Sequence, residues 1–384
     1  MKKTCVKLGD ICTVVSGSTP KSNVSDYWDG DVVWITPAEL TDSSYIVNDS
    51  VRHITQKAVQ ETSLKPFPAG TVILSSRAPI GKTAIAGCEM YCNQGFKNLI
   101  CSSRIYNKYL YFFLSGKTAF LNSLGRGATF KEISKAIVEN IEIRLPDEPE
   151  QRRIADKFEL IRKLEQDCYK QLSFLDELVK SRFVEMFGDT VLNPFGWERK
   201  TLGEICDVRD GTHDSPQYCE TGYPLVTAKN VTGGKIDIKD CSLICEEDFR
   251  RINERSKVDM GDIIMPMIGT VGKPVIVDIA PDFAIKNVAL IKFKQDSKVV
   301  NVYIHALLQS NYFDDAVLSK IRGGTQKFIS LGDIRKFKVL VPAMEIQEQF
   351  SAFVAEADKS KLAVKQSLDK LEMLKKSLMQ QYFG

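Results

Sequence analysis

The chain has 384 residues and a hydrophobic content of 43%, which is enough for two domains of ordinary size with apolar cores of their own. Its net charge of +3 permits nucleic-acid binding through local patches but does not by itself indicate such binding. No apolar stretch follows the lysines at the start, and no run long enough to cross a membrane occurs, which excludes a secretion signal and a membrane span and predicts a cytoplasmic protein.

Residues 1–147 are predicted to form the first domain, which mixes short strands with short helices. Its strand runs are rich in β-branched or alternating apolar residues and are bounded by Gly, Pro, Asp and Asn. The strand runs are 32–36, 71–75 and 141–145, and a helical pattern covers 107–114.

A glycine loop at 125–131 carries Arg126, Thr129 and Lys131. Glycines let a backbone approach a phosphate or a base edge closely, and an arginine can bind guanine or clamp a phosphate. These three residues are therefore candidate DNA contacts, and a tight turn with a solvated arginine is the alternative interpretation. Weaker candidates in other polar loops of this domain are Ser18, Lys21 and Arg77.

Residues 148–188 are predicted to form one long helix. Pro149 suits its first turn, Gly188 suits its end, and no Gly or Pro falls between 150 and 187. Apolar residues spaced alternately by three and four form a heptad pattern, which is typical of a helix that pairs with another helix. The positions assigned to this helix–helix interface are Ile154, Phe158, Ile161, Cys168, Leu172 and Leu175.

A linker at 189–196 leads to the second predicted domain, residues 197–342. Its strand runs are 223–227, 262–265 and 337–341, and its helical pattern covers 302–308. Its glycine loop offers both cations and an amide that can read adenine. The candidate DNA contacts of this domain are Arg322, Thr325, Gln326 and Lys327 in that loop, and His213, Lys229 and Asn230 elsewhere.

A second long helix is predicted at 343–384, with Val354, Val364, Leu368 and Leu371 at the matching heptad positions. The simplest way to bury both apolar stripes is to pair the two helices. Each helix could instead pack on its own domain, but about 38 residues make a rod of roughly 57 Å, which such a domain cannot cover. The predicted fold class is α+β: two mixed α/β domains in tandem, each followed by a long helix, with the helices in an antiparallel coiled coil of pseudo-two-fold symmetry.

The two halves repeat one another at an offset of about 196 residues. The segment 8–12 returns at 202–206, and 126–146 aligns with 322–342 without a gap. The identical pairs in that longer alignment are Arg126/Arg322, Gly127/Gly323, Thr129/Thr325, Lys131/Lys327, Ile133/Ile329, Ser134/Ser330 and Pro146/Pro342. A repeat of this kind suits a partner with two-fold symmetry, and duplex DNA is such a partner.

The sequence contains no recognisable catalytic motif. Its three histidines have neither zinc-ligand nor nucleophile-activating spacing. The Gly81-Lys82-Thr83 tripeptide lacks the earlier glycine of a phosphate-binding loop, and the ten cysteines are scattered, which favours reduced thiols. We therefore expect a protein without catalytic residues, bound metal or bound cofactor.

These features together resemble the DNA specificity subunits of type I restriction-modification systems. The resemblance covers essentially the whole chain and rests on the order and duplication of several motifs. They are the Leu-Gly-[Asp/Glu]-Ile openings at Leu8 and Leu202, the stretches 34–37 and 226–230, the Arg-Gly-x-Thr loops, and Gln151 and Gln347, each five residues after a proline.

The resemblance implies that each domain is a target recognition domain reading one half of a split double-stranded DNA site, with the helices setting the gap. It implies two modification subunits as partners, which bring S-adenosylmethionine and adenine methylation, and motor-nuclease subunits that use ATP and Mg. It implies no membrane partner. Two alternatives stay open: the specificity subunit of a stand-alone methyltransferase without nuclease, and a coiled-coil scaffold that binds only protein.

Overall fold

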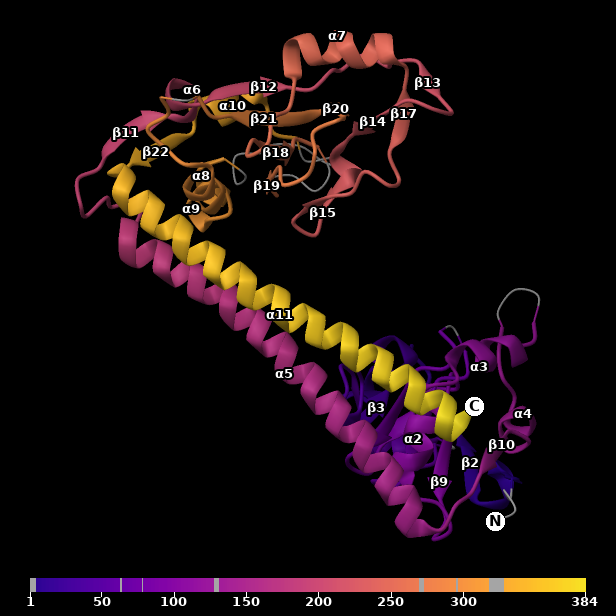
Figure 1. Cartoon of the computed structure of the whole chain (residues 1–384). Coiled ribbons are helices and arrows are strands. Elements are labelled where there is room, and N and C mark those ends of the chain that lie inside the picture. The colour runs from indigo at the N-terminus through magenta and orange to yellow at the C-terminus, as the bar shows by residue number, and fades with distance from the viewer. Residues whose placement is uncertain are drawn as a thin grey trace. The chain divides into compact units, whose positions relative to one another are not determined.

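The structure is a computed structural model that describes residues 5–62, 64–77, 79–127, 131–268, 273–294, 296–317 and 328–384. Figure 1 shows the chain as two compact units. Unit 1 comprises Met1–Cys168 and Gln366–Gly384, and unit 2 comprises Tyr169–Lys365. Each unit thus contains one of the two predicted domains together with part of both long helices, which were expected to be separate from the domains.

Unit 1 is built on a 5-stranded sheet of order β2-β9-β6-β7-β4, a 3-stranded sheet of order β5-β3-β8, and the antiparallel pair β1-β10. Its strands are β1 (Cys5–Lys7), β2 (Cys12–Ser16), β3 (Trp28–Ile35), β4 (Ile46–Val47), β5 (His53–Ile54), β6 (Val72–Leu74), β7 (Thr83–Ala86), β8 (Tyr91–Cys92), β9 (Lys97–Cys101) and β10 (Glu142–Arg144). Its short helices are α1 (Gln56–Glu61), α2 (Asn107–Ser115), α3 (Thr118–Leu124) and α4 (Lys135–Glu139).

Unit 2 has two 4-stranded sheets, of order β12-β21-β18-β19 and β13-β17-β14-β20, and the pairs β11-β22 and β15-β16. Its strands are β11 (Glu198–Thr201), β12 (Asp207–Asp210), β13 (Tyr218–Cys219), β14 (Tyr223–Val226), β15 (Val231–Thr232), β16 (Lys235–Ile236), β17 (Ser242–Ile244), β18 (Ile263–Pro266), β19 (Val275–Ile276), β20 (Ala284–Ile285), β21 (Val288–Lys292) and β22 (Lys338–Val341). Its short helices are α6 (Leu202–Ile205), α7 (Glu246–Ser256), α8 (Asn301–Leu308), α9 (Asn311–Ala316) and α10 (Leu331–Lys336).

The long helices α5 (Glu148–Phe187) and α11 (Met344–Phe383) have 40 residues each. In unit 1 the beginning of α5 lies beside the end of α11. Lys157 Nζ donates a hydrogen bond to the Tyr382 hydroxyl at 2.8 Å, and Lys375 Nζ lies 3.1 Å from Glu165 Oε2. The ring of Phe158 stacks on that of Phe383 with 5.7 Å between centroids.

In unit 2 the end of α5 lies beside the beginning of α11. Phe183 and Phe187 pack against Phe350 with centroid separations of 5.6 and 5.3 Å, and Lys361 Nζ lies 2.7 Å from Asp176 Oδ1. In both units, rising residue numbers on α5 meet falling numbers on α11. The two helices therefore pair in the antiparallel direction within each unit.

The positions assigned to the helix–helix interface all lie on the covered side of their helices. The buried ones are Ile154, Phe158 and Ile161, and the half-buried ones are Cys168, Leu172, Leu175, Val354, Val364, Leu368 and Leu371. Ile154 and Phe158 also belong to the apolar core of unit 1, and Val354 packs on that of unit 2. Each helix thus packs on the other helix along its length, and its end residues also pack into the apolar core of the unit in which they lie.

The strand and helix patterns found in the sequence are confirmed. The runs at 32–36, 71–75 and 141–145 overlap with β3, β6 and β10, and those of the second half overlap with β14, β18 and β22. The predicted helical patterns correspond to α2, α8, α5 and α11, and the mixed α and β character of the two tandem domains is likewise confirmed.

Candidate nucleic-acid interface

The repeated Leu-Gly motif has a structural role in each unit. Leu8 N–H donates to the Ile141 carbonyl at 2.9 Å, and Leu202 N–H donates to the Phe337 carbonyl at 2.8 Å. A Cβ added at Gly9 would lie 3.0 Å from Glu139 Cβ, and one added at Gly203 would lie 3.2 Å from Arg335 Cβ. The lack of a side chain therefore lets the backbone at Gly9 lie close to α4 and the backbone at Gly203 lie close to α10. These are the helices that follow the two glycine loops.

A second repeated feature holds the segment after each glycine loop against the sheet. Ile133 N–H donates to the Ser76 carbonyl and Ile329 N–H donates to the Met267 carbonyl, both at 2.9 Å. The next residue, Ser134 or Ser330, accepts a hydrogen bond from a backbone N–H in the first turn of α4 or α10. The same backbone frame thus positions the loop region in both units.

In unit 1 this frame gathers several charged residues from distant parts of the sequence. Arg77 and Arg126 both bridge the backbone of Glu132, and Arg126 exchanges two backbone hydrogen bonds of 3.0 Å with it. Lys97, whose side chain is only 9% exposed, places Nζ 3.1 Å from Glu132 Oε1. Lys131 is exposed beside them. Candidates from two separate loops, Arg77 from one and Arg126 and Lys131 from the other, are therefore neighbours along the backbone of Glu132.

The loop that follows β2 lies against the loop that follows β8. A Cβ at Gly17 would lie 2.0 Å from the Cys92 carbonyl oxygen, and Thr19 Oγ1 donates to Gln94 Oε1 at 2.5 Å. Ser18 and Lys21 use their carbonyls to accept hydrogen bonds from the indoles of Trp34 and Trp28 at 3.1 and 3.3 Å. Because Ser76 N–H donates to the Gly95 carbonyl at 2.8 Å, these loops adjoin the charged cluster.

Each unit has a groove beside this frame, and the two grooves are lined by residues at equivalent positions of the repeat. The groove of unit 1 has a volume of about 980 Å³ and includes Arg126, Glu132 and Ser134. The groove of unit 2 has a volume of about 590 Å³ and includes Phe328 and Ser330, which lie 196 positions after Glu132 and Ser134. The repeat therefore preserves a groove as well as a fold, while the residues that line it differ.

In unit 2 the candidate His213 is part of a polar cluster. Its Nδ1 lies 2.8 Å from Asn287 Oδ1 and its Nε2 lies 2.9 Å from Asp210 Oδ2. The hydrogen bonds to Asn287 and then to Asp210 raise the pKa of His213 above its usual value. Asp210 also pairs with Arg255 of α7, whose side chain is 70% exposed. The cluster thus offers cationic groups at the surface of this unit.

The structure corrects one candidate of unit 2. Asn230 is buried, and its Oδ1 accepts hydrogen bonds from Thr227 N–H at 3.1 Å and from Thr227 Oγ1 at 2.9 Å. This side chain caps a short turn of helix at 228–230, so we do not retain Asn230 as a DNA contact. Its neighbour Lys229 is exposed and stays a candidate.

Other candidates of the glycine loops lie outside the described residues. They are Thr129 in unit 1 and Arg322, Thr325, Gln326 and Lys327 in unit 2. Lys97, Glu132 and Arg255 were not among the predicted residues, and the structure brings them into the same regions as the candidates. A signal for Lys97 was present, because it stands between Phe96 and the apolar run 99–101, and a lysine that is buried with such neighbours has to find a partner.

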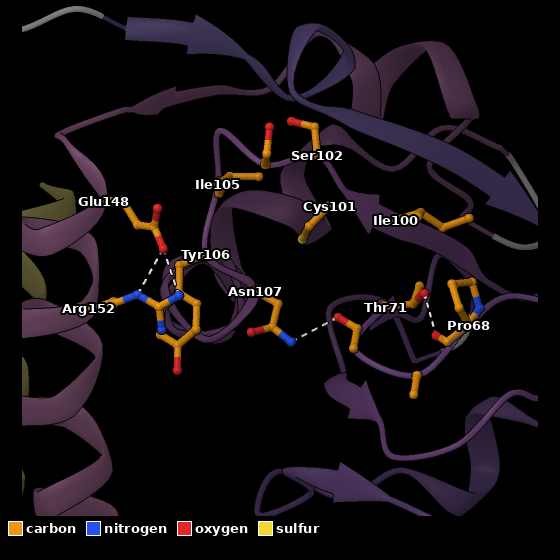
Figure 2. A pocket seen from close by; sticks show the side chains of 13 residues that line it. Pro68, Thr71, Ile100, Cys101, Ser102, Ile105, Tyr106, Asn107, Glu148 and Arg152 are labelled. Carbon is orange, nitrogen blue, oxygen red and sulfur yellow. Dashed lines mark hydrogen bonds and ion pairs between the residues drawn. The ribbon is translucent and has the colours of Figure 1, made fainter.

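A smaller pocket of about 330 Å³ lies in unit 1 between the first turn of α5 and the loops at 68–71 and 101–107 (Figure 2). The Arg152 guanidinium pairs with Glu148 Oε1 at 2.6 Å and stands 4.3 Å from the centroid of the Tyr106 ring. The Asn107 amide donates to the Gly70 carbonyl at 3.0 Å. Of these contacts, the one between Arg152 and the Tyr106 ring joins the start of α5 to the domain.

Within the described ranges, the structure contains no group of three or more His, Cys, Asp and Glu residues placed to hold a metal ion. Over the same residues, no helix combines the length and the apolar character that a membrane crossing requires. All ten cysteines are free thiols.

Known proteins share this sequence and this fold. The family model described as "Type I restriction modification DNA specificity domain" matches residues 2–173 and 194–373. The specificity subunit of the type I restriction enzyme MjaIX from Methanocaldococcus jannaschii is 32% identical over 382 residues, which cover 91% of this chain and 85% of the relative. The EcoBI specificity subunit from Escherichia coli is 22% identical over 358 residues, or 83% of this chain and 75% of the relative.

Two solved structures have the same fold over nearly the whole chain. The S subunit of a type I restriction-modification system from M. genitalium matches with a TM-score of 0.58 and 15% identity, covering 99% of this chain and 96% of that one. A chain from a study of complex assembly and conformational transition of the type I R-M system matches with a TM-score of 0.63 and 19% identity, covering 99% and 97%. With the family model matching both halves, the chain belongs to the family of type I restriction-modification DNA specificity subunits.

Proposed function

We propose that this chain recognises a bipartite sequence in double-stranded DNA and that each unit reads one half-site. The observation that carries the proposal is the repeated backbone frame, which presents a groove in each unit and a cation-rich edge at Arg77, Arg126 and Lys131 in unit 1. Cations beside a groove suit phosphate contacts, while side chains that differ between the units suit different base sequences.

Partner subunits supply the chemistry in this proposal. Two modification subunits bind the chain and carry S-adenosylmethionine for adenine methylation, and motor-nuclease subunits bring ATP and Mg. The chain itself selects the DNA. The MjaIX relative is named as the specificity subunit of a restriction enzyme, which supports a role inside such an assembly.

We further propose that α5 provides part of the surface for a modification subunit. Beside its covered positions, α5 exposes a second apolar stripe at Leu160, Leu164, Phe174 and Leu178, which are 58, 42, 73 and 44% exposed. Their spacing keeps them on one face of the helix, and exposed apolar stripes of this kind favour a helical partner. The long helices also set the gap between the half-sites.

The test of the proposal is selection of duplexes from a randomised pool by the full chain together with its modification subunit. We expect a consensus of two short specified blocks separated by unspecified base pairs. Inserting seven residues into both α5 and α11 should lengthen the gap and leave the blocks unchanged. A chain that selects no sequence, or an insertion that leaves the gap unaltered, would contradict the corresponding part of the proposal.

A further inference from the structure

Two positions beside the grooves are structurally equivalent in the two units. In unit 1 Arg77 bridges Glu132 in the antiparallel direction, and in unit 2 Ile268 bridges Phe328 in the same way. A repeated hydrogen bond lies beside each bridge. In unit 1 it runs from Ile133, which follows Glu132, to the carbonyl of Ser76, which precedes Arg77. In unit 2 it runs from Ile329, which follows Phe328, to the carbonyl of Met267, which precedes Ile268. Arg77 therefore corresponds to Ile268, and Glu132 corresponds to Phe328.

A third equivalent position comes from the strand register. Ser16 is paired with Lys97 in the β2–β9 ladder, and Asp210 is paired with Ala289 in the β12–β21 ladder. Ser16 and Asp210 stand at the same distance, eight residues, after the repeated leucines at 8 and 202. Lys97 of unit 1 therefore corresponds to Ala289 of unit 2.

The three positions have opposite chemistry in the two units. In unit 1 all three are charged, and Lys97 Nζ lies 3.1 Å from Glu132 Oε1 and 3.4 Å from Ser76 Oγ. In unit 2 all three are apolar. Ala289 is fully buried, Ile268 packs at the edge of the core, and Phe328 is 50% exposed.

The change is coordinated, and the frame around it is not changed. A buried ammonium without its carboxylate would be costly, so Glu132 cannot be replaced by an apolar residue while Lys97 remains. The serine caps, the leucine–glycine contacts and the isoleucine hydrogen bonds are the same in both units. At these three positions the units therefore differ in side chains beside the groove while the local frame is kept, and side chains beside a groove are where two readers of different sequences must differ.

We propose that these equivalent positions determine base specificity, with Arg77 and Glu132 reading a G·C pair in one half-site and Ile268 and Phe328 reading a thymine methyl in the other. Lys97 is a positioning residue that holds the Glu132 carboxylate in place. This inference rests on the proposed function and names the residues through which it operates.

The base classes follow from the groups that each unit presents. A carboxylate accepts a hydrogen bond from the cytosine N4 amino group, and an arginine donates to guanine O6 and N7. The buried Lys97 ammonium already holds the Glu132 side chain in place, so this side chain loses less conformational entropy when it binds the base. An aromatic ring and an aliphatic side chain instead offer an apolar contact, and in the major groove the apolar group is the thymine methyl.

The first experiment is duplex selection by the full chain with its modification subunit, using wild type, Arg77→Ile/Lys97→Ala/Glu132→Phe, Glu132→Gln and Phe328→Ala. We expect the triple variant to lose the G·C requirement in one block and to keep the other specified positions of that same block, which shows that unit 1 is still folded. The block read by unit 2 should not change. Glu132→Gln should weaken discrimination at one base pair by about tenfold. Phe328→Ala should change only the other block.

Glu89→Gln is the matched control for Glu132→Gln, because Glu89 is exposed elsewhere in unit 1.

The second experiment replaces the thymine of the Phe328-dependent block with deoxyuridine. Wild type should bind the substituted duplex about fourfold more weakly, as expected for one lost methyl contact, and Phe328→Ala should not distinguish the two duplexes. The inference is overturned if the variants select the wild-type consensus, or if loss of the methyl affects both proteins equally. If wild type selects no sequence at all, the proposed function itself fails.

Discussion

Gln151 and Gln347, which stand at the beginnings of the two long helices, make the same three hydrogen bonds in their own units. The Oε1 atoms accept from the N–H groups of Tyr106 and Val300 at 2.7 and 3.0 Å. The Nε2 atoms donate to the carbonyl five residues earlier and to one further carbonyl at 2.8 to 3.0 Å. Both side chains are buried, so each glutamine ties the start of a helix to its domain.

Replacing Gln347 with leucine should therefore destabilise unit 2. The variant leaves one buried N–H and two buried carbonyls without this partner, at a cost of about 2–3 kcal/mol. For a unit of this size we expect the Tm to fall by about 5–10 °C in calorimetry. Gln366→Leu is the matched control, because Gln366 is exposed on the same helix, and it should leave the Tm nearly unchanged. Equal shifts for the two variants would contradict the anchoring role.

Much of the fold could be predicted because its signals are local. The heptad spacing, a first-turn proline and the terminal Gly188 were sufficient for α5, and alternating β-branched runs were sufficient for strands such as β10. The strand order was not predictable, since nothing local specifies that β9 pairs with both β2 and β6. Helix pairing was expected and the packing of each helix on a domain was considered only as its alternative, whereas the structure shows both.

The candidate site was only partly predictable for the same reason. Arg126 and Lys131 were recognised together in one glycine loop and Arg77 separately, but the pairing of Arg77 with Glu132 beside that loop depends on tertiary structure. Asn230 was misread because a short polar side chain after a strand can equally cap its own turn, as it does with Thr227.

Arg126→Ala should weaken DNA binding and make it less sensitive to salt. Arg126 is exposed at the groove of unit 1, and removing one phosphate contact should reduce the slope of log affinity against log salt by about 0.9. Fluorescence anisotropy between low and physiological salt measures this slope. Lys65→Ala, at an exposed lysine away from the groove, should keep the wild-type slope. An unchanged slope for Arg126→Ala would remove this residue from the interface.

His213 should make unit 2 less stable as the pH rises above neutrality. Its folded-state pKa is raised above the usual 6.5 by hydrogen bonds to Asn287 and Asp210. The stabilisation is therefore fully present below pH 6.5 and is lost as the pH rises through the folded-state pKa. His213→Gln should lower the Tm at pH 6 more than at pH 8.5. A variant whose Tm difference from wild type is the same at both values would contradict this assignment.

Phe174→Glu should prevent stable association with the modification subunit while the chain remains folded. Phe174 is 73% exposed on the second apolar stripe of α5, so a carboxylate there adds a charge to the proposed contact without disturbing the core. Co-purification of the two subunits measures the loss. Phe195→Glu is the matched control, since Phe195 is 54% exposed in the linker, and it should co-purify as wild type does.

Exchanging the charges of Glu165 and Lys375 should test the antiparallel pairing of the two helices in unit 1. Their side chains are 20% and 41% exposed and lie 3.1 Å apart, which predicts a coupling of about 0.3–1 kcal/mol. Glu165→Lys and Lys375→Glu should each lower the free energy of urea unfolding, because each places like charges together. The double exchange should recover most of that loss, as measured by a double-mutant cycle. Exchanging Glu372 with Lys376, a pair within α11 alone, controls for helix propensity. If the single losses add without recovery in the double variant, Glu165 and Lys375 do not face each other in solution.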